Sequence, residues 1–80
     1  MKTNEAIAKR VQDLCAEKGI TINALSILAG MPRSTIYSMM YECNKNPKIM
    51  SIKRICDAFG ITLCDFFDTD YFRDLEPEFD

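Results

Sequence analysis

The sequence predicts an all-α domain of five short helices followed by an acidic tail. Apolar residues recur every three or four positions along most of the chain, and no segment alternates long enough to form a β-strand. Glycine, proline or a capping residue separates each periodic segment from the next. A chain of 80 residues forms one domain at most. We expect this domain over residues 1–68 and the tail over residues 69–80.

The first predicted helix spans Asn4 to Lys18. Its apolar residues share one helical face: Ile7, Val11, Leu14 and Cys15. Thr3 or Asn4 can cap its first turn, and Gly19 can end it in the left-handed conformation.

A second and a third helix are expected on either side of Gly30. The second begins at the candidate N-cap Thr21 and ends at Gly30, with a short apolar face made of Leu25, Leu28 and Ala29. Pro32 then suits the first turn of a new helix, because proline lacks a backbone donor. The third helix runs from Arg33 to Tyr41. Its spacing turns Ile36, Met39 and Met40 inward, and Arg33, Ser34, Tyr37 and Ser38 outward.

Two more helices follow a polar connection from Glu42 to Lys48. The fourth lies near Met50 to Phe59 and ends at Gly60. The fifth, Leu63 to Phe67, has Thr62 as its N-cap, and Asp65 occupies the acidic position of a capping box.

Charge is distributed unevenly along the chain. Residues 1–64 hold nine Lys and Arg against five Asp and Glu, a net charge of +4. Residues 65–80 hold Arg73 against seven Asp and Glu, a net charge of −6. The distribution matters more than the total of −2. This pattern fits a mildly basic body that contacts phosphate groups and an acidic tail that does not.

The four cysteines do not form a pattern typical of a metal site. They are Cys15, Cys43, Cys56 and Cys64, they include no C-x-x-C pair, and the chain has no histidine. We expect reduced thiols that serve as small apolar residues. No metal, cofactor or small-molecule ligand is predicted. An enzyme is not expected either, since there is no glycine-rich phosphate loop and no nucleophile with a base at sensible spacing.

A cytoplasmic location is expected from two features of the sequence. No apolar run approaches the roughly 20 residues that cross a bilayer. The first ten residues are polar and lack the apolar block of a signal peptide.

The stretch from Thr21 to Tyr41 has the features of a helix-turn-helix. That motif needs a tight turn, often with glycine, between helices that cross at about 90–120°. Ser26 and Ala29 offer small side chains at the crossing, and Leu25, Met31 and Ile36 offer apolar anchors. The exposed face of the second helix of such a motif is polar, because it enters the major groove of DNA.

Residues 21–36, TINALSILAGMPRSTI, resemble the helix-turn-helix of the Cro and phage-repressor (XRE-like) family, which typically reads T-Q-x-x-L-A-x-x-A-G-[VM]-S-x-x-[ST]-[IL]. Flanking segments are also similar to that family, so the resemblance covers roughly residues 4–68. It implies a five-helix, lambda-repressor-like domain of a bacterial or phage transcription regulator. Such proteins bind double-stranded DNA, usually as homodimers, and a repressor is expected rather than an activator.

The resemblance also implies roles for individual residues. Base contacts are implied for Arg33, Ser34 and Ser38, with Arg33 able to pair bidentately with guanine. Contacts to the DNA backbone are implied for Thr21, Asn23, Thr35, Tyr37, Lys45, Asn46 and Lys48. Tyr37 could also meet a sugar or a thymine methyl group, or pack against the second helix.

Three positions depart from the family pattern. Ile22 replaces a glutamine, which removes a polar contact that Asn23 could replace. Met40 replaces an acid that often pairs with the arginine at position 10, so Arg10 lacks its expected partner. Pro32 replaces the usual N-cap serine.

The tail leaves alternatives open. Acidic ends are often disordered, but Tyr71, Phe72, Leu75 and Phe79 are apolar for a solubility tail. A dimer interface could form from Phe66, Phe67, Tyr71 and Phe72. The tail could instead fold back on its own body, or compete with DNA for the basic face. The alternative function is a protein-interaction module, such as an antitoxin or a regulator's partner, that keeps the same fold.

Overall fold

The computed structural model describes residues 1–42 and 46–79, and every regular element in them is a helix. The helices are α1 (Thr3–Lys18), α2 (Ile22–Ala29), α3 (Arg33–Tyr41), α4 (Ile49–Phe59), α5 (Leu63–Phe67) and α6 (Asp70–Arg73). The all-α prediction is confirmed, and five helices fall within a residue or so of the expected bounds. The sixth, α6, lies inside the segment predicted as a tail. Its four residues are too few to leave a periodic apolar pattern in the sequence.

Glycines and threonines set the helix boundaries that the sequence predicts. Gly19, Gly30 and Gly60 end α1, α2 and α4 in the left-handed conformation. Thr21 caps α2 by accepting a hydrogen bond from the amide of Ala24 at 3.1 Å. Thr62 and Asp65 form the expected capping box at the start of α5.

The first helix has a different cap from the one expected. It begins at Thr3, and the carboxylate of Glu5 accepts from the amide of Lys2 at 2.8 Å. Thr3 is the first residue of the helix and not its N-cap, and its hydroxyl donates to the carboxylate of Glu78 in the C-terminal segment at 2.9 Å.

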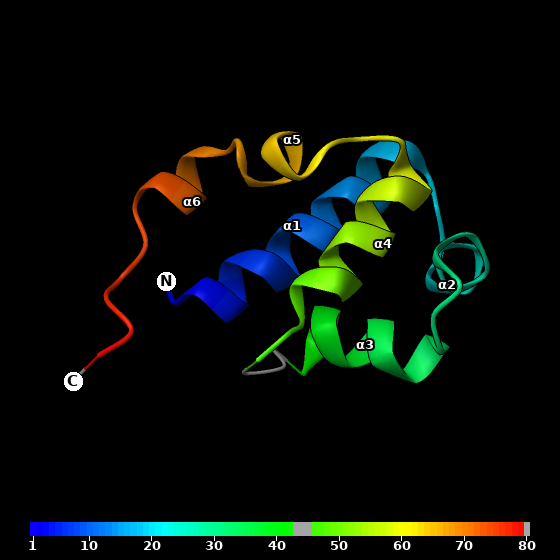
Figure 1. Ribbon diagram of the computed structural model, residues 1–80, viewed down its shortest axis with the longest axis horizontal. Helices are drawn as coiled ribbons and strands as arrows, with labels where there is room; N and C mark the ends of the chain where they lie inside the picture. The colour runs from blue at the N-terminus through cyan, green and yellow to red at the C-terminus, as the bar shows by residue number, and fades with distance from the viewer. Residues whose placement is uncertain (43–45, 80) are drawn as a thin grey trace.

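One core joins the helices, with α1 through its middle (Figure 1). α1 packs chiefly against α3, α2 packs against α3 and α4, and α5 packs against α4. The largest side chains that are fully buried are Val11, Leu25, Ile36, Ile55, Cys56 and Phe66. Among the described residues, no polar or charged residue is fully buried. The fold therefore rests on apolar packing, and its polar contacts lie at or near the surface.

The apolar face of α2 differs from the predicted one at Leu28. Leu25 and Ala29 are buried as expected, but Leu28 is 58% exposed. Ile22 packs against the core instead, at the spacing i, i+3, i+7 with Leu25 and Ala29. Ile22, Leu25 and Ala29 thus form the inward face of α2, and Leu28 points outward.

The C-terminal segment lies against α1. Phe72 packs beside the aromatic rings of Phe66 and Phe67, with ring centroids 6.0 and 4.9 Å away. The Tyr71 hydroxyl donates to a carboxylate oxygen of Asp13 at 3.4 Å, and burial with that neighbouring carboxylate raises the pKa of Tyr71. Beyond α6, the amide of Glu76 donates to the backbone carbonyl of residue 1 at 3.1 Å. In this structure residues 71, 76 and 78 therefore make contacts with residues 1–13, and whether the tail also forms a dimer interface stays a prediction.

Three cysteines lie in the described residues, and all are free thiols. Cys15 and Cys56 are buried, and burial raises the pKa of both thiols. Cys64 is exposed on α5, and Cys43 lies outside the described residues. The buried pair therefore serves as small apolar core residues, as expected for free cysteine. Over residues 1–42 and 46–79, no helix has the length and apolar character that crossing a membrane requires.

Candidate nucleic-acid interface

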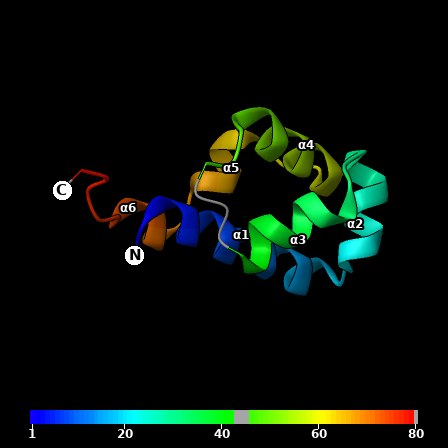
Figure 2. The ribbon, with the colours of Figure 1, turned by 90° about the horizontal axis from the view of Figure 1, so that it is seen from below.

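The third helix presents a polar face to solvent. Ile36, Met39 and Met40 anchor α3 in the core with at most 3% of their surface exposed. On the other side, Arg33, Ser34 and Tyr37 are exposed, and Ser38 and Thr35 are half-buried. Figure 2 shows α3 and α2 toward one end of the molecule, with α6 and the C-terminal segment at the other. The sequence-predicted inward and outward faces of α3 are therefore the observed ones.

Arg33, the first residue of α3, has an exposed side chain. It makes no hydrogen bond or ion pair with any residue that the structure describes. Residues 20–41 contain no Asp or Glu, so no carboxylate within the two helices competes for this guanidinium. A planar guanidinium without a partner can form two parallel hydrogen bonds to the edge of a base or to a phosphate.

A pair of tyrosines lies farther along the same face. The ring centroids of Tyr37 and Tyr41 are 5.0 Å apart, and the side chains are 49% and 55% exposed. With Arg33 they occupy every fourth position, which is one stripe of the helix. Sequence reasoning missed Tyr41, although its spacing of four from Tyr37 was the signal that could have found it.

The start of α2 borders this face. The hydroxyl of Thr21 is engaged in the N-cap, Asn23 is exposed, and Ile22 faces the core. Arg54 of α4 reaches the turn between the two helices, where it donates to the carbonyl of Gly30 at 3.4 Å. The turn of the helix-turn-helix is thus contacted by a basic side chain that is itself exposed.

The connection after α3 is only partly described. Lys45 lies outside the described residues. Asn46 is exposed and has a contact within the chain, and Lys48 is exposed as the N-cap residue of α4. Lys48 therefore presents its charge at the start of α4, beside the exposed Ile49 and Met50.

The four residues predicted for a dimer interface lie together, but their side chains are buried to different extents. Phe66 has 0% of its surface exposed, so in this fold it belongs to the core of its own chain. Phe67, Tyr71 and Phe72 are half-buried. Their shared aromatic cluster includes the edge-on contact of Phe66 with Phe67 at 5.0 Å. The role of these side chains between chains stays a prediction.

Within the described part of the chain, no group of three or more His, Cys, Asp or Glu residues could hold a metal ion. The described carboxylates that follow residue 64 lie on α5 and α6, at the C-terminal ends of these helices, or in the segment that follows α6. This end of the molecule lies away from α2 in Figures 1 and 2. The polar face of α3 is therefore separated from most of the negative charge of the chain.

Comparisons with known proteins agree with this geometry. The family model of the Cro/C1-type HTH DNA-binding domain matches residues 10–70. The crystal structure of the prophage Lp1 protein 11 is similar over 94% of this chain and 100% of that one, with 33% sequence identity and a TM-score of 0.79. No curated protein matches the chain. From its fold, its helix-turn-helix and this match, the chain belongs to the Cro/C1-type helix-turn-helix DNA-binding family.

Proposed function

We propose that this protein binds double-stranded DNA at specific sequences and regulates transcription, with α3 in the major groove. The observation that carries the proposal is the face of α3, where Arg33 has no hydrogen-bond or ion-pair partner among the described residues, Ser34 is exposed, and α2 and α3 hold no carboxylate. An α-helix with such a face fits the width of the major groove.

The base contacts in this proposal come from Arg33, Ser34 and Ser38. Arg33 pairs with the O6 and N7 of a guanine, while the two serines are less selective. The half-buried state of Ser38 limits it to a base that the helix approaches closely. Arg33 is accordingly the main source of sequence preference.

Contacts to the DNA backbone set the register and most of the affinity. We assign them to the start of α2, to the side of α3 and to the connection that precedes α4. The residues are Thr21, Asn23, Thr35, Tyr37, Lys45, Asn46 and Lys48. Because the Thr21 hydroxyl already accepts in the N-cap, it would donate its own proton to a phosphate oxygen.

The protein acts as a homodimer in this proposal, and it represses rather than activates. Each chain has one recognition helix, and a two-fold dimer reads two half-sites about 34–36 Å apart. The exposed parts of Phe67, Tyr71 and Phe72 supply the contact between chains, since aromatic residues are enriched in such interfaces. Sedimentation of the protein with and without DNA tests the stoichiometry.

Selection of duplexes from a random pool, followed by fluorescence polarisation, tests the DNA-binding proposal. We expect one enriched sequence, bound with an affinity that falls steeply as salt rises. Absence of binding to every duplex at low salt would overturn the proposal. Binding without any enrichment would reduce it to non-specific DNA binding.

A protein-interaction module is the second candidate, and exposed apolar side chains on α2 favour it. Ile27 and Leu28 are 74% and 58% exposed on a helix whose other face enters the core. Co-purification of a stoichiometric protein partner, without affinity for DNA, would favour this function over the first.

A further inference from the structure

The helices of this fold end in two ways. α1, α2 and α4 end at a left-handed glycine, and the amides that follow bond back to the last turn. α3 ends at Glu42, which has φ −94° and ψ −1°, and α5 ends at Asp68, which has φ −87° and ψ 69°. Neither α3 nor α5 therefore has the glycine arrangement that satisfies terminal carbonyl groups.

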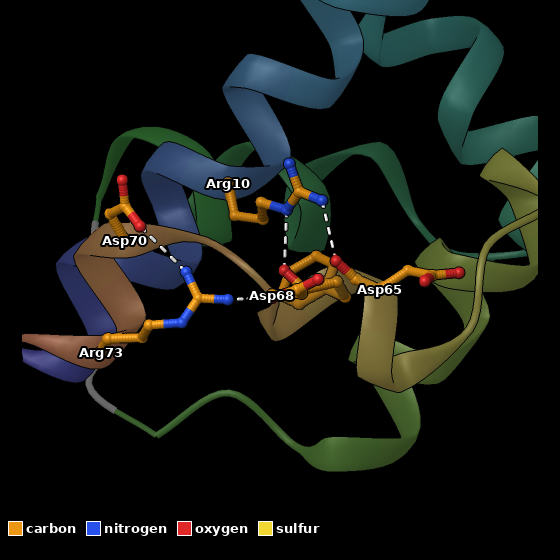
Figure 3. Close-up of polar contacts among 6 residues, drawn as sticks. Arg10, Asp65, Asp68, Asp70 and Arg73 are labelled. Atoms are coloured by element: carbon orange, nitrogen blue, oxygen red, sulfur yellow. Dashed lines mark hydrogen bonds and ion pairs between the residues drawn. The ribbon is translucent and has the colours of Figure 1, made fainter.

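Side chains of α1 bind the carbonyl groups at these two ends. The amide Nε2 of Gln12 donates to the carbonyl of Met40 in the last turn of α3. Arg10 donates to the carbonyls of Phe66 at 2.7 Å and Asp65 at 2.9 Å, at the end of α5 (Figure 3). One turn of α1 thus caps, from outside, α3 and α5, two of the helices that lack a glycine cap.

We infer that Gln12 is a positioning residue for the recognition helix, acting through the carbonyl of Met40. The inference rests on the proposed function, since it gives α3 the task of reading DNA. Gln12 lies 28 positions from Met40 and on another helix, so it fixes α3 relative to α1 rather than within itself.

The end of α3 needs such a bond for a physical reason. A nine-residue helix is marginal in isolation, and its last turn is the first part to fray. The carbonyl of Met40 is one of the last four of α3, which have no amide partner inside the helix itself. Tyr41, the next residue, is paired with Tyr37 on the polar face. Movement of this turn therefore moves the face proposed to meet DNA.

The surroundings of Gln12 indicate that its hydrogen bond affects the position of α3 more than the stability of the whole protein. Gln12, Thr21, Met40 and Tyr41 are among the residues that line a groove of about 520 Å³ between α1, the start of α2 and the end of α3. Gln12 is only partly buried, so water can reach the Met40 carbonyl if its donor is removed. Loss of the bond should thus cost little stability while freeing the end of α3.

Gln12→Met tests the inference, because methionine keeps the length of the side chain and removes the donor. We expect DNA affinity to fall about 5-fold, as for one neutral hydrogen bond. Amide hydrogen exchange in the last turn of the DNA-free α3 should rise, while exchange in α4 stays unchanged. Glu17→Gln is the matched control, since it varies an exposed position of the same helix.

Gln12→Glu adds a reversible form of the test. At neutral pH the introduced carboxylate would face the Met40 carbonyl, and two hydrogen-bond acceptors repel each other. The affinity for DNA should therefore fall more than in Gln12→Met. The neighbouring acceptor raises the pKa of the introduced carboxyl above its ordinary value, so acidification supplies an O–H donor and the affinity relative to wild type should recover. Asp13, Cys15 and Tyr41 are titratable groups that line the same groove, and wild type measured at each pH accounts for them.

The outcomes distinguish the two levels of the proposal. If Gln12→Met binds DNA like wild type and its α3 amides exchange no faster, the inference is overturned and the proposed function stands. If Gln12→Glu does not recover on acidification, the hydrogen bond is not the means by which position 12 acts. If no duplex binds wild type, the proposed function fails, while hydrogen exchange still reports on the bond to α3.

Discussion

The Nε of Arg10 donates to the backbone carbonyl of Phe66 across 56 positions of the sequence, at 2.7 Å. The same guanidinium binds the carbonyl of Asp65 (Figure 3). It also lies 6.0 Å from the centre of the Phe66 ring. A cation at a helix C-terminus also meets the negative end of the helix dipole. Arg10, which lacks the acidic partner of the family pattern, therefore stabilises α5.

Arg10→Ala should lower the free energy of unfolding by about 2 kcal/mol, because hydrogen bonds from a charged donor are lost at a partly buried site. Arg10→Lys should recover only part of this, since an ammonium group cannot match the fork of the guanidinium. Urea denaturation followed by circular dichroism measures both. Lys53→Ala is the control, because its surface ion pair with Asp57 on α4 should contribute less than about 0.5 kcal/mol. Equal losses from Arg10→Ala and Lys53→Ala would contradict the role of Arg10.

Arg33→Ala and Lys48→Ala should weaken DNA binding in different ways. Loss of the Arg33 fork should reduce discrimination at one base pair by about 1–3 kcal/mol. Loss of Lys48 should weaken all duplexes alike and reduce the salt slope by about one. Polarisation titrations on the selected duplex and on a mismatched one, at several salt concentrations, separate the two effects. If both variants lose the same discrimination, the division of roles is wrong.

The sequence predicts local features of this fold well, and contacts between distant residues poorly. Helix bounds follow from Gly19, Gly30 and Gly60 and from the caps Thr21 and Thr62, because these act within one turn. The prediction that Leu28 lies on the inward face of α2 is wrong, because packing decides the rotation of a helix of only eight residues.

The contacts that α1 makes with the ends of α3 and α5 could not be predicted from the sequence, for a related reason. Gln12 and Arg10 bind backbone carbonyls, which every residue carries, so no residue type marks the partner. The polar face of α3 could be predicted because helical spacing determines it. The way in which α1 supports that face depends on tertiary structure, and only the folded chain reveals it.

Gly30→Ala should destabilise the protein through its backbone alone. Gly30 has φ +63°, and an added Cβ would meet nothing within 4 Å. The cost is therefore the strain of a left-handed alanine, about 1 kcal/mol, which lowers the Tm by roughly 4–8 °C in a domain of this size. Gly30→Asn should lose less, because asparagine tolerates this conformation. A thermal melt checks both, and an alanine variant as stable as wild type would contradict the explanation.

Acid should destabilise the protein through carboxylates at two helix starts. Hydrogen bonds with Thr62 hold the pKa of Asp65 below its usual range, and hydrogen bonds from Thr3 do the same for Glu78. A pKa that is lower in the folded state means that fewer protons bind there than in the unfolded chain. The stabilisation is complete above the unfolded values of about 4, and it is lost as pH falls through the folded ones.

Asp65→Asn should flatten this acid dependence, because asparagine can still accept at the Thr62 amide but does not titrate. Thermal melts between about pH 6 and pH 3 measure the profile. An Asp65→Asn profile as steep as that of wild type would show that acid acts elsewhere in the chain.

Phe72→Ala should destabilise the isolated chain, because its ring joins the C-terminal segment to the core. The ring is half-buried against Phe67 and the fully buried Phe66, so a loss of about 2 kcal/mol is expected, less than for a fully buried phenylalanine. Phe79→Ala is the matched control, since that ring is 80% exposed and should contribute less than about 0.5 kcal/mol.

The effect of Phe72→Ala at different protein concentrations distinguishes contacts within one chain from contacts between chains. Contacts within one chain give the same loss at every concentration, whereas contacts between chains give a loss that grows as the protein associates. Urea denaturation of dilute protein, in which chains are separate, should therefore retain the loss of about 2 kcal/mol that comes from contacts within the chain, and any further loss at higher concentration would report the proposed contact between chains. If the effect disappears on dilution, the ring stabilises a dimer rather than its own chain, and the packing of residues 70–78 against α1 is not what stabilises this end of the fold.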